Sequence, residues 1–259
     1  MMDIRILKRT DTKMEFVLKD ADAAFANALR RIMISEIPTM AIEYVDMEEN
    51  RSGLFDEVIA HRLGLIPIIF PSTYNIKEEC KCGGKGCSQC EAVFTLEKEG
   101  PGFAKAGDMK NKDENTKPVD PNIPIVELLE GQKIKFEAVA QLGYGRDHAK
   151  WQAANVGYKN MVNIRLNHES AEKAMQVCPA RVFEKKGNAV SVAEPMNCIL
   201  CMKCTETGSA TVAPDETSFI FTVESISGLS SREILLKSLD ILESKANEFK
   251  KELKKAMKE

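Results

Sequence analysis

The chain has 259 residues, of which 44% are hydrophobic and 29% are charged, a balance typical of globular proteins that bury a core. Its net charge is −3 at pH 7, and because proteins that bind the nucleic-acid backbone usually need a basic surface, we expect little or no direct contact with DNA. The apolar stretches, such as residues 63–70, are too short to cross a bilayer, and the first residues do not resemble a secretory signal, so we expect a cytoplasmic protein with no membrane contact.

The first half of the chain predicts two helices and several short strands. The first helix is indicated by Phe25, Leu29 and Ile32, which recur at helical spacing, and Pro38 prevents its continuation. Residues 97–124 are rich in Lys, Asp, Gly, Asn and Pro, which predicts an exposed irregular loop. The other predicted elements are strands at 4–8 and 14–18, the first helix at 22–36, a strand at 41–47, a second helix at 54–63 and a strand at 65–69.

The second half predicts further strands and a long final helix. Strands are expected at 133–141, 161–166 and 218–226, and the last of these alternates clearly. The final helix begins with a capping box, in which Ser230 and Glu233 each satisfy a backbone amide of the other. Its apolar residues form a heptad seam, which favours a partner helix, although packing on the chain's own sheet would give the same pattern. The seam residues are Leu235, Leu239, Leu242, Ala246, Phe249 and Leu253.

Four parts of the sequence carry a family likeness. They are FANALRRI at 25–32 with IPTMAI at 37–42, DEVIAHRLGLIP at 56–67, GYGRDHAKW at 143–151, and VESISGL at 223–229 with the helix that follows. In this order they resemble the alpha-like family of DNA-directed RNA polymerase subunits, in particular its archaeal members and their eukaryotic counterparts. The likeness covers most of the chain.

The resemblance implies an α+β fold with three domains. An alpha-subunit-like dimerisation domain would be formed by both chain ends, residues 1–48 and 218–259. A mainly β domain would be inserted at 49–167. The cysteine spacing described below adds a zinc-type loop to that domain and predicts a small ferredoxin-like iron–sulfur domain at 168–217.

The resemblance also implies a function in transcription. The chain would be a non-catalytic subunit of a nucleotidyltransferase complex, without catalytic residues of its own, because the active-site magnesium of this family belongs to a large subunit. It would form a heterodimer with the small subunit L. This pair would be the platform on which the two large catalytic subunits assemble, joined by the small subunits N and P.

The expected partner interface combines the first and the last helix. In this family context, two adjacent arginines of the first helix are expected to contact a partner subunit or solvent rather than a phosphate group. The expected interface residues are Phe25, Leu29, Arg30, Arg31, Ile32, Leu235, Leu239, Leu242 and Phe249.

The eight cysteines fall into two sets of four, and close cysteines in a reducing compartment more often bind metal than form disulfides. In two-cluster bacterial ferredoxins, the cysteine before a proline ligates the cluster held by the other three-cysteine loop. Cys178 precedes Pro179, and Cys198, Cys201 and Cys204 have the spacing of such a loop. We therefore expect one [4Fe–4S] cluster on these four thiolates, with a hairpin of strands at 180–183 and 189–192 between them. Zinc, a three-iron [3Fe–4S] cluster or a disulfide are the alternatives.

The other set lies within 11 residues and contains three glycines, which let a chain wrap closely around an ion. Closed sites of four sulfurs are typical of structural zinc. We expect one Zn²⁺ on Cys80, Cys82, Cys87 and Cys90, with an empty, partly oxidised loop or a second iron site as alternatives.

Two other functions compete with the polymerase subunit. The iron–sulfur insert is also compatible with a stand-alone ferredoxin-type electron carrier, but that class does not explain the alpha-like flanks of a much longer chain. A zinc-dependent nucleic-acid-binding protein is disfavoured by the acidic charge balance.

Overall fold

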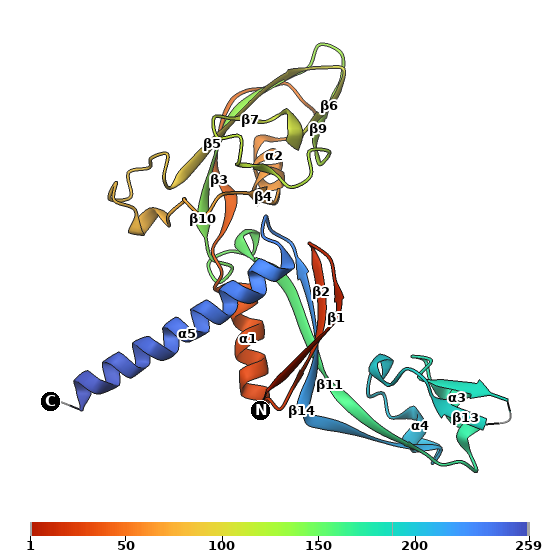
Figure 1. Ribbon diagram of the computed structural model, residues 1–259. Coiled ribbons are helices and arrows are strands. Elements are labelled where there is room, and N and C mark those ends of the chain that lie inside the picture. The colour runs from red at the N-terminus through yellow and green to blue at the C-terminus, as the bar shows by residue number, and fades with distance from the viewer. Residues whose placement is uncertain (1, 188, 258–259) are drawn as a thin grey trace. The chain divides into compact units, whose positions relative to one another are not determined.

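A computed structural model of the protein describes residues 2–187 and 189–257 (Figure 1). The chain divides into two compact units, and each collects segments that are distant in sequence. The first unit comprises Met1–Arg9, Met14–Arg30 and Gly157–Thr222. The second comprises Thr10–Lys13, Arg31–Val156 and Val223–Glu259. Helices and strands are both abundant, which confirms the mixed α+β class.

The first unit is built on a four-stranded sheet in the order β1-β2-β14-β11. Phe16 stacks on Phe221 with ring centroids 5.0 Å apart, and both rings are fully buried, so the core of this sheet joins the two ends of the chain. α1 begins where the Asp22 carboxylate accepts a hydrogen bond from the Phe25 N–H at 2.6 Å. The bounds are β1 Asp3–Arg9, β2 Lys13–Lys19, α1 Ala23–Ser35, β11 Ala154–Leu166 and β14 Ala210–Ser225.

Strands β11 and β14 continue from this sheet into a small distal part of the same unit, which carries the second cysteine set (Figure 1). Its core is a small cluster around Val182, Phe183, Val190 and Val212. It contains α3 Ala171–Val177, β12 Phe183–Lys186, β13 Ala189–Val192, the short helix Pro195–Asn197 and α4 Lys203–Glu206.

The second unit contains a sheet in the order β3-β10-β5-β7. One face of the sheet is buried under α2 through Ile59 and Leu63, and Phe94 and Phe136 lie in the same core. The bounds are β3 Thr39–Asn50, α2 Asp56–Gly64, β4 Ile68–Ile69, η1 Lys77–Glu79, β5 Glu91–Glu99, β6 Gly102–Lys105, η2 Ala106–Asp108, β7 Lys110–Asn111, β8 Lys117–Pro118, β9 Pro124–Leu128, β10 Lys133–Gly143 and η3 Ala149–Trp151.

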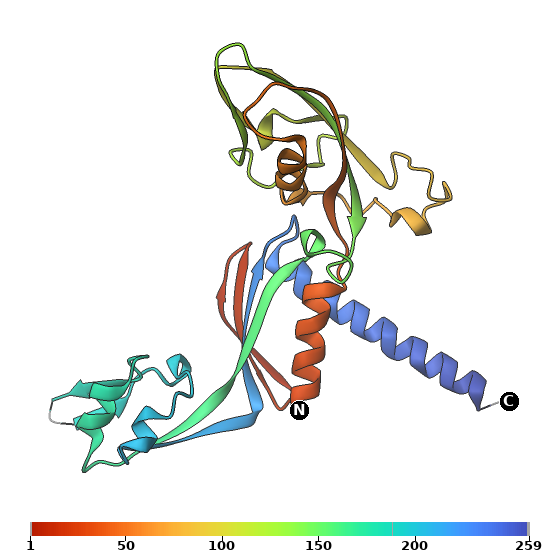
Figure 2. The same cartoon turned by 180° about the vertical axis from the view of Figure 1, so that it is seen from behind.

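The last helix, α5, runs over Ser231–Ala256 and begins with the predicted capping box (Figure 2). The loop predicted at 97–124 is wrong in part, because it contains β6, β7, β8 and a short helix. These pieces are too short to show a period, and their partners are distant in sequence, as in the pairing of β6 with β9. The first hairpin strand lies at 183–186 rather than 180–183. Within the residues that the structure describes, no helix is long and apolar enough to span a membrane.

Candidate metal centres and partner surface

The first cysteine set forms a compact knuckle between η1 and β5. The Cys80 and Cys87 sulfurs are 3.6 Å apart, those of Cys82 and Cys90 are 3.7 Å apart, and those of Cys87 and Cys90 are 3.8 Å apart. All four sulfurs lie within 4.8 Å of one another. Among the described residues, this is the one group of three or more Cys, His, Asp or Glu side chains that could share a single ion.

These separations match one zinc ion. Four thiolates at about 2.3 Å from zinc occupy the corners of a tetrahedron whose edges are about 3.8 Å. The backbone supports the turn, because Gly83 and Gly86 adopt positive φ values of 67° and 89°. A Cβ atom at Gly86 would also meet the Glu91 carboxylate, and that side chain would have to shift. The four residues therefore fit a single, tetrahedrally coordinated metal ion.

The thiols of the knuckle differ in pKa because burial and their mutual hydrogen bonds act on each of them to a different extent. Burial raises the pKa of the Cys90 thiol to about 12. Burial also acts to raise the pKa of Cys82, but hydrogen bonds from the Cys80 thiol and the Gly86 backbone lower it to about 7. Four such thiols cannot all ionise without a cation, and a bound metal supplies that charge.

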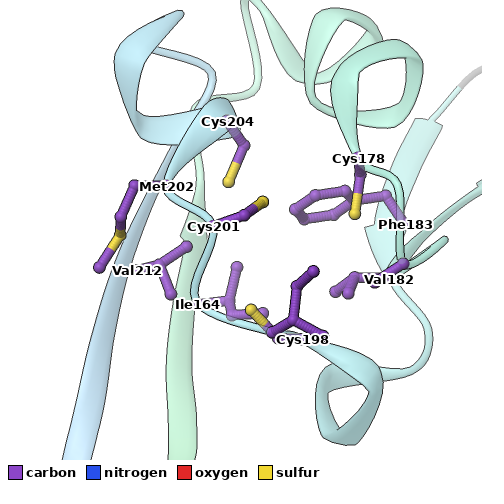
Figure 3. A pocket seen from close by; sticks show the side chains of 11 residues that line it. Ile164, Cys178, Val182, Phe183, Cys198, Cys201, Met202, Cys204 and Val212 are labelled. Atoms are coloured by element: carbon purple, nitrogen blue, oxygen red, sulfur yellow. The ribbon is translucent and has the colours of Figure 1, made fainter.

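The second cysteine set surrounds a pocket in the distal part of the first unit (Figure 3). Cys204 is buried, Cys178 and Cys198 are half-buried, and Cys201 is exposed. The seven other residues that line the pocket are all apolar: Ile164, Ala180, Val182, Phe183, Ile199, Met202 and Val212. The chain thus places the four thiols around a hollow rather than in contact with one another.

This arrangement fits a polynuclear cluster better than one ion. In a cubane each thiolate binds a different iron, so the four sulfurs stand further apart than they do around a single metal. An apolar lining also limits access of water to such a cluster. Ile199 lines the pocket and is nevertheless 61% exposed, so it does not belong to the core of this part.

Unusual backbone conformations concentrate at the same pocket. Of the four non-glycine residues with positive φ in the described chain, Arg181, Leu200 and Met202 flank these cysteines. Left-handed backbone is unfavourable for bulky side chains and often marks a functional site. Alternation of right- and left-handed residues also turns successive amides toward a concave anionic site, as in many iron–sulfur loops. No sequence pattern indicated these conformations.

The apolar seam of α5 is largely uncovered. Phe249 and Leu253 are 69% and 48% exposed, and Leu239 is 38% exposed. Leu235 and Leu242 are half-buried, and every described residue beyond Leu242 is exposed. Packing on the chain's own sheet therefore does not account for the second half of the seam.

The first helix offers less surface than the sequence suggested. Leu29 and Ile32 are each only 3% exposed, so they belong to the chain's own core. Phe25 and Arg30 are half-buried, and Arg31 is exposed. The Arg30 guanidinium donates hydrogen bonds to the Asn27 side chain, which holds it along the helix.

Comparison with known protein families identifies part of this architecture. Residues 42–166 match the family model described as the RNA polymerase Rpb3/RpoA insert domain. This range contains α2, the cysteine knuckle and the β3-β10-β5-β7 sheet except for the start of β3. This part of the chain therefore has the fold of the Rpb3/RpoA insert domain.

Relatives that match nearly the full length of the chain identify its family. The DNA-directed RNA polymerase subunit Rpo3 of Archaeoglobus fulgidus is 42% identical over 97% of each chain. The Rpo3 subunits of Methanosarcina acetivorans and Thermococcus kodakarensis are 40% and 36% identical, over 96% and 98% of this chain and 97% and 99% of their own lengths. The chain belongs to the Rpo3 family of DNA-directed RNA polymerase subunits. This confirms the predicted polymerase family, and the relatives' names do not mention electron transfer.

Proposed function

We propose that the chain is a non-catalytic assembly subunit of a DNA-directed RNA polymerase. It pairs with a small alpha-like subunit, L, and the pair forms the platform on which the two large catalytic subunits assemble. The small subunits N and P join the same platform. The dimerisation domain comprises residues 1–48 and 218–259, with the mainly β domain at 49–167 and the iron–sulfur domain at 168–217 inserted between them.

The observation that carries this proposal is the exposed apolar seam of α5. A helix that leaves Leu239, Phe249 and Leu253 in water loses the free energy that their burial would provide, about 1.5–3 kcal/mol for each fully buried side chain. A partner helix that covers the seam recovers this energy. The heptad spacing is the pattern that such a helix–helix contact requires.

The two cysteine sets have separate roles in the proposal. Cys80, Cys82, Cys87 and Cys90 hold one structural zinc ion, and the separations between their sulfurs support this. Cys178, Cys198, Cys201 and Cys204 hold one [4Fe–4S] cluster, supported by the apolar pocket between them. The distal part has a core of few and mostly small residues, so the bound cluster acts first as a staple for its fold.

Anaerobic purification of a tagged copy of the chain from cells tests the proposal. The other polymerase subunits should co-purify with it, and the purified material should show promoter-dependent RNA synthesis activity. Recovery of the chain with a reductase and without polymerase subunits would contradict the proposal and favour an electron carrier.

A further inference from the structure

One lysine of the first unit connects the four-stranded sheet to the cysteine pocket. Lys159 lies on β11, and its ammonium donates a hydrogen bond to the backbone carbonyl of Cys198 at 3.3 Å. Cys198 is one of the four cysteines around the apolar pocket (Figure 3). Both residues belong to the first unit, although they are 39 positions apart in the sequence. The contact therefore places a cationic side chain of the sheet beside the proposed cluster site.

Neighbouring residues fix the part of β11 that carries this lysine. The Tyr158 ring meets the Phe219 ring edge-on, with the ring centroids 5.5 Å apart, and Phe219 is fully buried. The Asn160 side chain donates a hydrogen bond to the Asp215 carbonyl of β14 at 2.9 Å. Because the residues before and after it are both held in place, Lys159 extends from a firmly anchored position of the strand.

The Lys159 ammonium lacks an acidic partner. The side chain is half-buried, and among the described residues it forms no ion pair. Lys185 in the distal part, by contrast, contacts Glu172 at 2.6 Å. Charged groups that are partly withdrawn from water usually have a counter-charge. The cysteine thiolates, once they bind iron, supply negative charge on the side of Lys159 where its hydrogen bond lies.

Two other cations lie near these cysteines in the sequence, but both are exposed to water. Arg181 lies shortly after Cys178, and Lys203 directly precedes Cys204. Water and salt screen the field of an exposed charge more strongly than that of a half-buried one. Of the three cations, Lys159 is therefore expected to act most strongly on a group held in the pocket.

We propose that Lys159 is a positioning residue for the [4Fe–4S] cluster and raises its reduction potential. The inference rests on the cluster that the proposed function assigns to Cys178, Cys198, Cys201 and Cys204. With four thiolate ligands such a cluster carries net negative charge, which grows when the cluster accepts an electron. A fixed cation nearby stabilises the reduced form more than the oxidised form. The hydrogen bond also holds the Cys198 carbonyl and thereby helps to orient this ligand.

Anaerobic redox titration of the iron-loaded full chain tests the proposal with three variants. Lys159→Gln removes the charge, Lys159→Arg keeps it, and Lys173→Gln removes an exposed lysine of α3 that does not line the pocket. In Lys159→Gln the equilibrium constant for one-electron reduction should fall about tenfold, which lowers the midpoint potential by about 59 mV. Lys159→Arg and Lys173→Gln should keep the wild-type potential. An unchanged potential in Lys159→Gln, or an equal fall in either of the other two variants, would overturn the role of the Lys159 charge.

Amine labelling supplies a second measurement that leaves Lys159 in place, so it also applies if Lys159→Gln does not retain the cluster. An acylating reagent followed by mass spectrometry should modify Lys159 several-fold more slowly than Lys173 in the iron-loaded chain. In Cys201→Ser, which should lack the cluster, the two lysines should react at similar rates. Equal rates in the loaded chain would overturn the contact of Lys159 with the pocket.

The cluster assignment and the role of Lys159 fail in distinguishable ways. If the anaerobically prepared wild-type chain contains no [4Fe–4S] cluster, the assignment fails and the inference fails with it. If the cluster is present but neither its potential nor the labelling of Lys159 behaves as expected, the inference about Lys159 alone is wrong.

Discussion

Ser230 and Glu233 cap α5 reciprocally. The Ser230 N–H donates to the Glu233 carboxylate at 2.8 Å, and the Glu233 N–H donates to the Ser230 hydroxyl at 3.2 Å. The adjacent Ser231 hydroxyl donates to the Thr10 carbonyl at 2.9 Å, so the start of the helix is also tied to a turn near the other chain end. The helix that carries the exposed seam therefore starts at a position fixed by local hydrogen bonds.

The cap predicts a pH-dependent contribution to stability. Hydrogen bonds from Ser230 hold the pKa of Glu233 below its ordinary value of 4.5. A lowered pKa in the folded chain stabilises it above pH 4.5, and this contribution is lost as the pH falls through the folded value. Glu233→Gln should lower the free energy of unfolding by about 0.5–1 kcal/mol at pH 7 and by much less at pH 3. Urea unfolding of both proteins at the two pH values measures this. A difference that is unchanged at pH 3, or equalled by the exposed control Glu243→Gln, would refute the cap's role.

The exposed seam predicts that a substitution there weakens pairing with subunit L without destabilising the chain itself. Phe249 is mostly exposed in the chain, so Phe249→Asp should leave the melting temperature unchanged. It should weaken the pair with subunit L by several kcal/mol, because it places a charge at an apolar interface. Ser244→Asp adds the same charge off the seam and should have little effect. Isothermal titration calorimetry with subunit L measures the affinities of wild type, Phe249→Asp and Ser244→Asp. Equal affinities would exclude the seam as the interface.

The cluster pocket predicts selective loss of iron. Anaerobically prepared protein should contain about four irons per chain. Cys201→Ser should abolish the iron absorbance, expose residues 168–217 to limited proteolysis and leave the pair with L formed, because this part has its own small core. Iron analysis and mass spectrometry of the fragments provide the measurement. A protease-resistant insert without iron would show that the cluster is not a staple.

The cysteine knuckle predicts that zinc can be lost while the iron is retained. Cys90 is fully buried, and its sulfur lies within 3.8 Å of two other thiols. Cys90→Ser should therefore release one zinc ion per chain and loosen the loop before β5, while the iron content stays unchanged. Elemental analysis of the variant measures both metals. Loss of iron in Cys90→Ser would show that the two cysteine sets are wrongly assigned.

Local signals account for what the sequence predicted well. Asp22 and the Ser230–Glu233 box fix helix starts through neighbouring residues, so both helices were predictable. Close cysteine spacing likewise indicated the knuckle. Features set by distant residues were missed. The left-handed backbone of Leu200 and Met202 has no local signature. The hydrogen bond from Lys159 to the Cys198 carbonyl joins residues that are 39 positions apart in the sequence.

Burial explains why the interface prediction needs refinement. Leu29 and Leu239 both occupy apolar positions at helical spacing, yet Leu29 is 3% exposed and Leu239 is 38% exposed. Periodicity identifies the apolar face of a helix, but it does not say which molecule covers that face. Only the packed structure separates the chain's own core from a surface that is available to a partner.

Sedimentation equilibrium of the chain co-expressed with subunit L is the decisive measurement for the assembly role. The expected result is a single species with the mass of one chain plus one partner, stable to dilution into the nanomolar range. The Phe249→Asp chain should sediment as separate components at the same concentrations. If the wild-type chain and subunit L sediment separately, or if this chain forms only a homodimer, the pairing through α5 is incorrect.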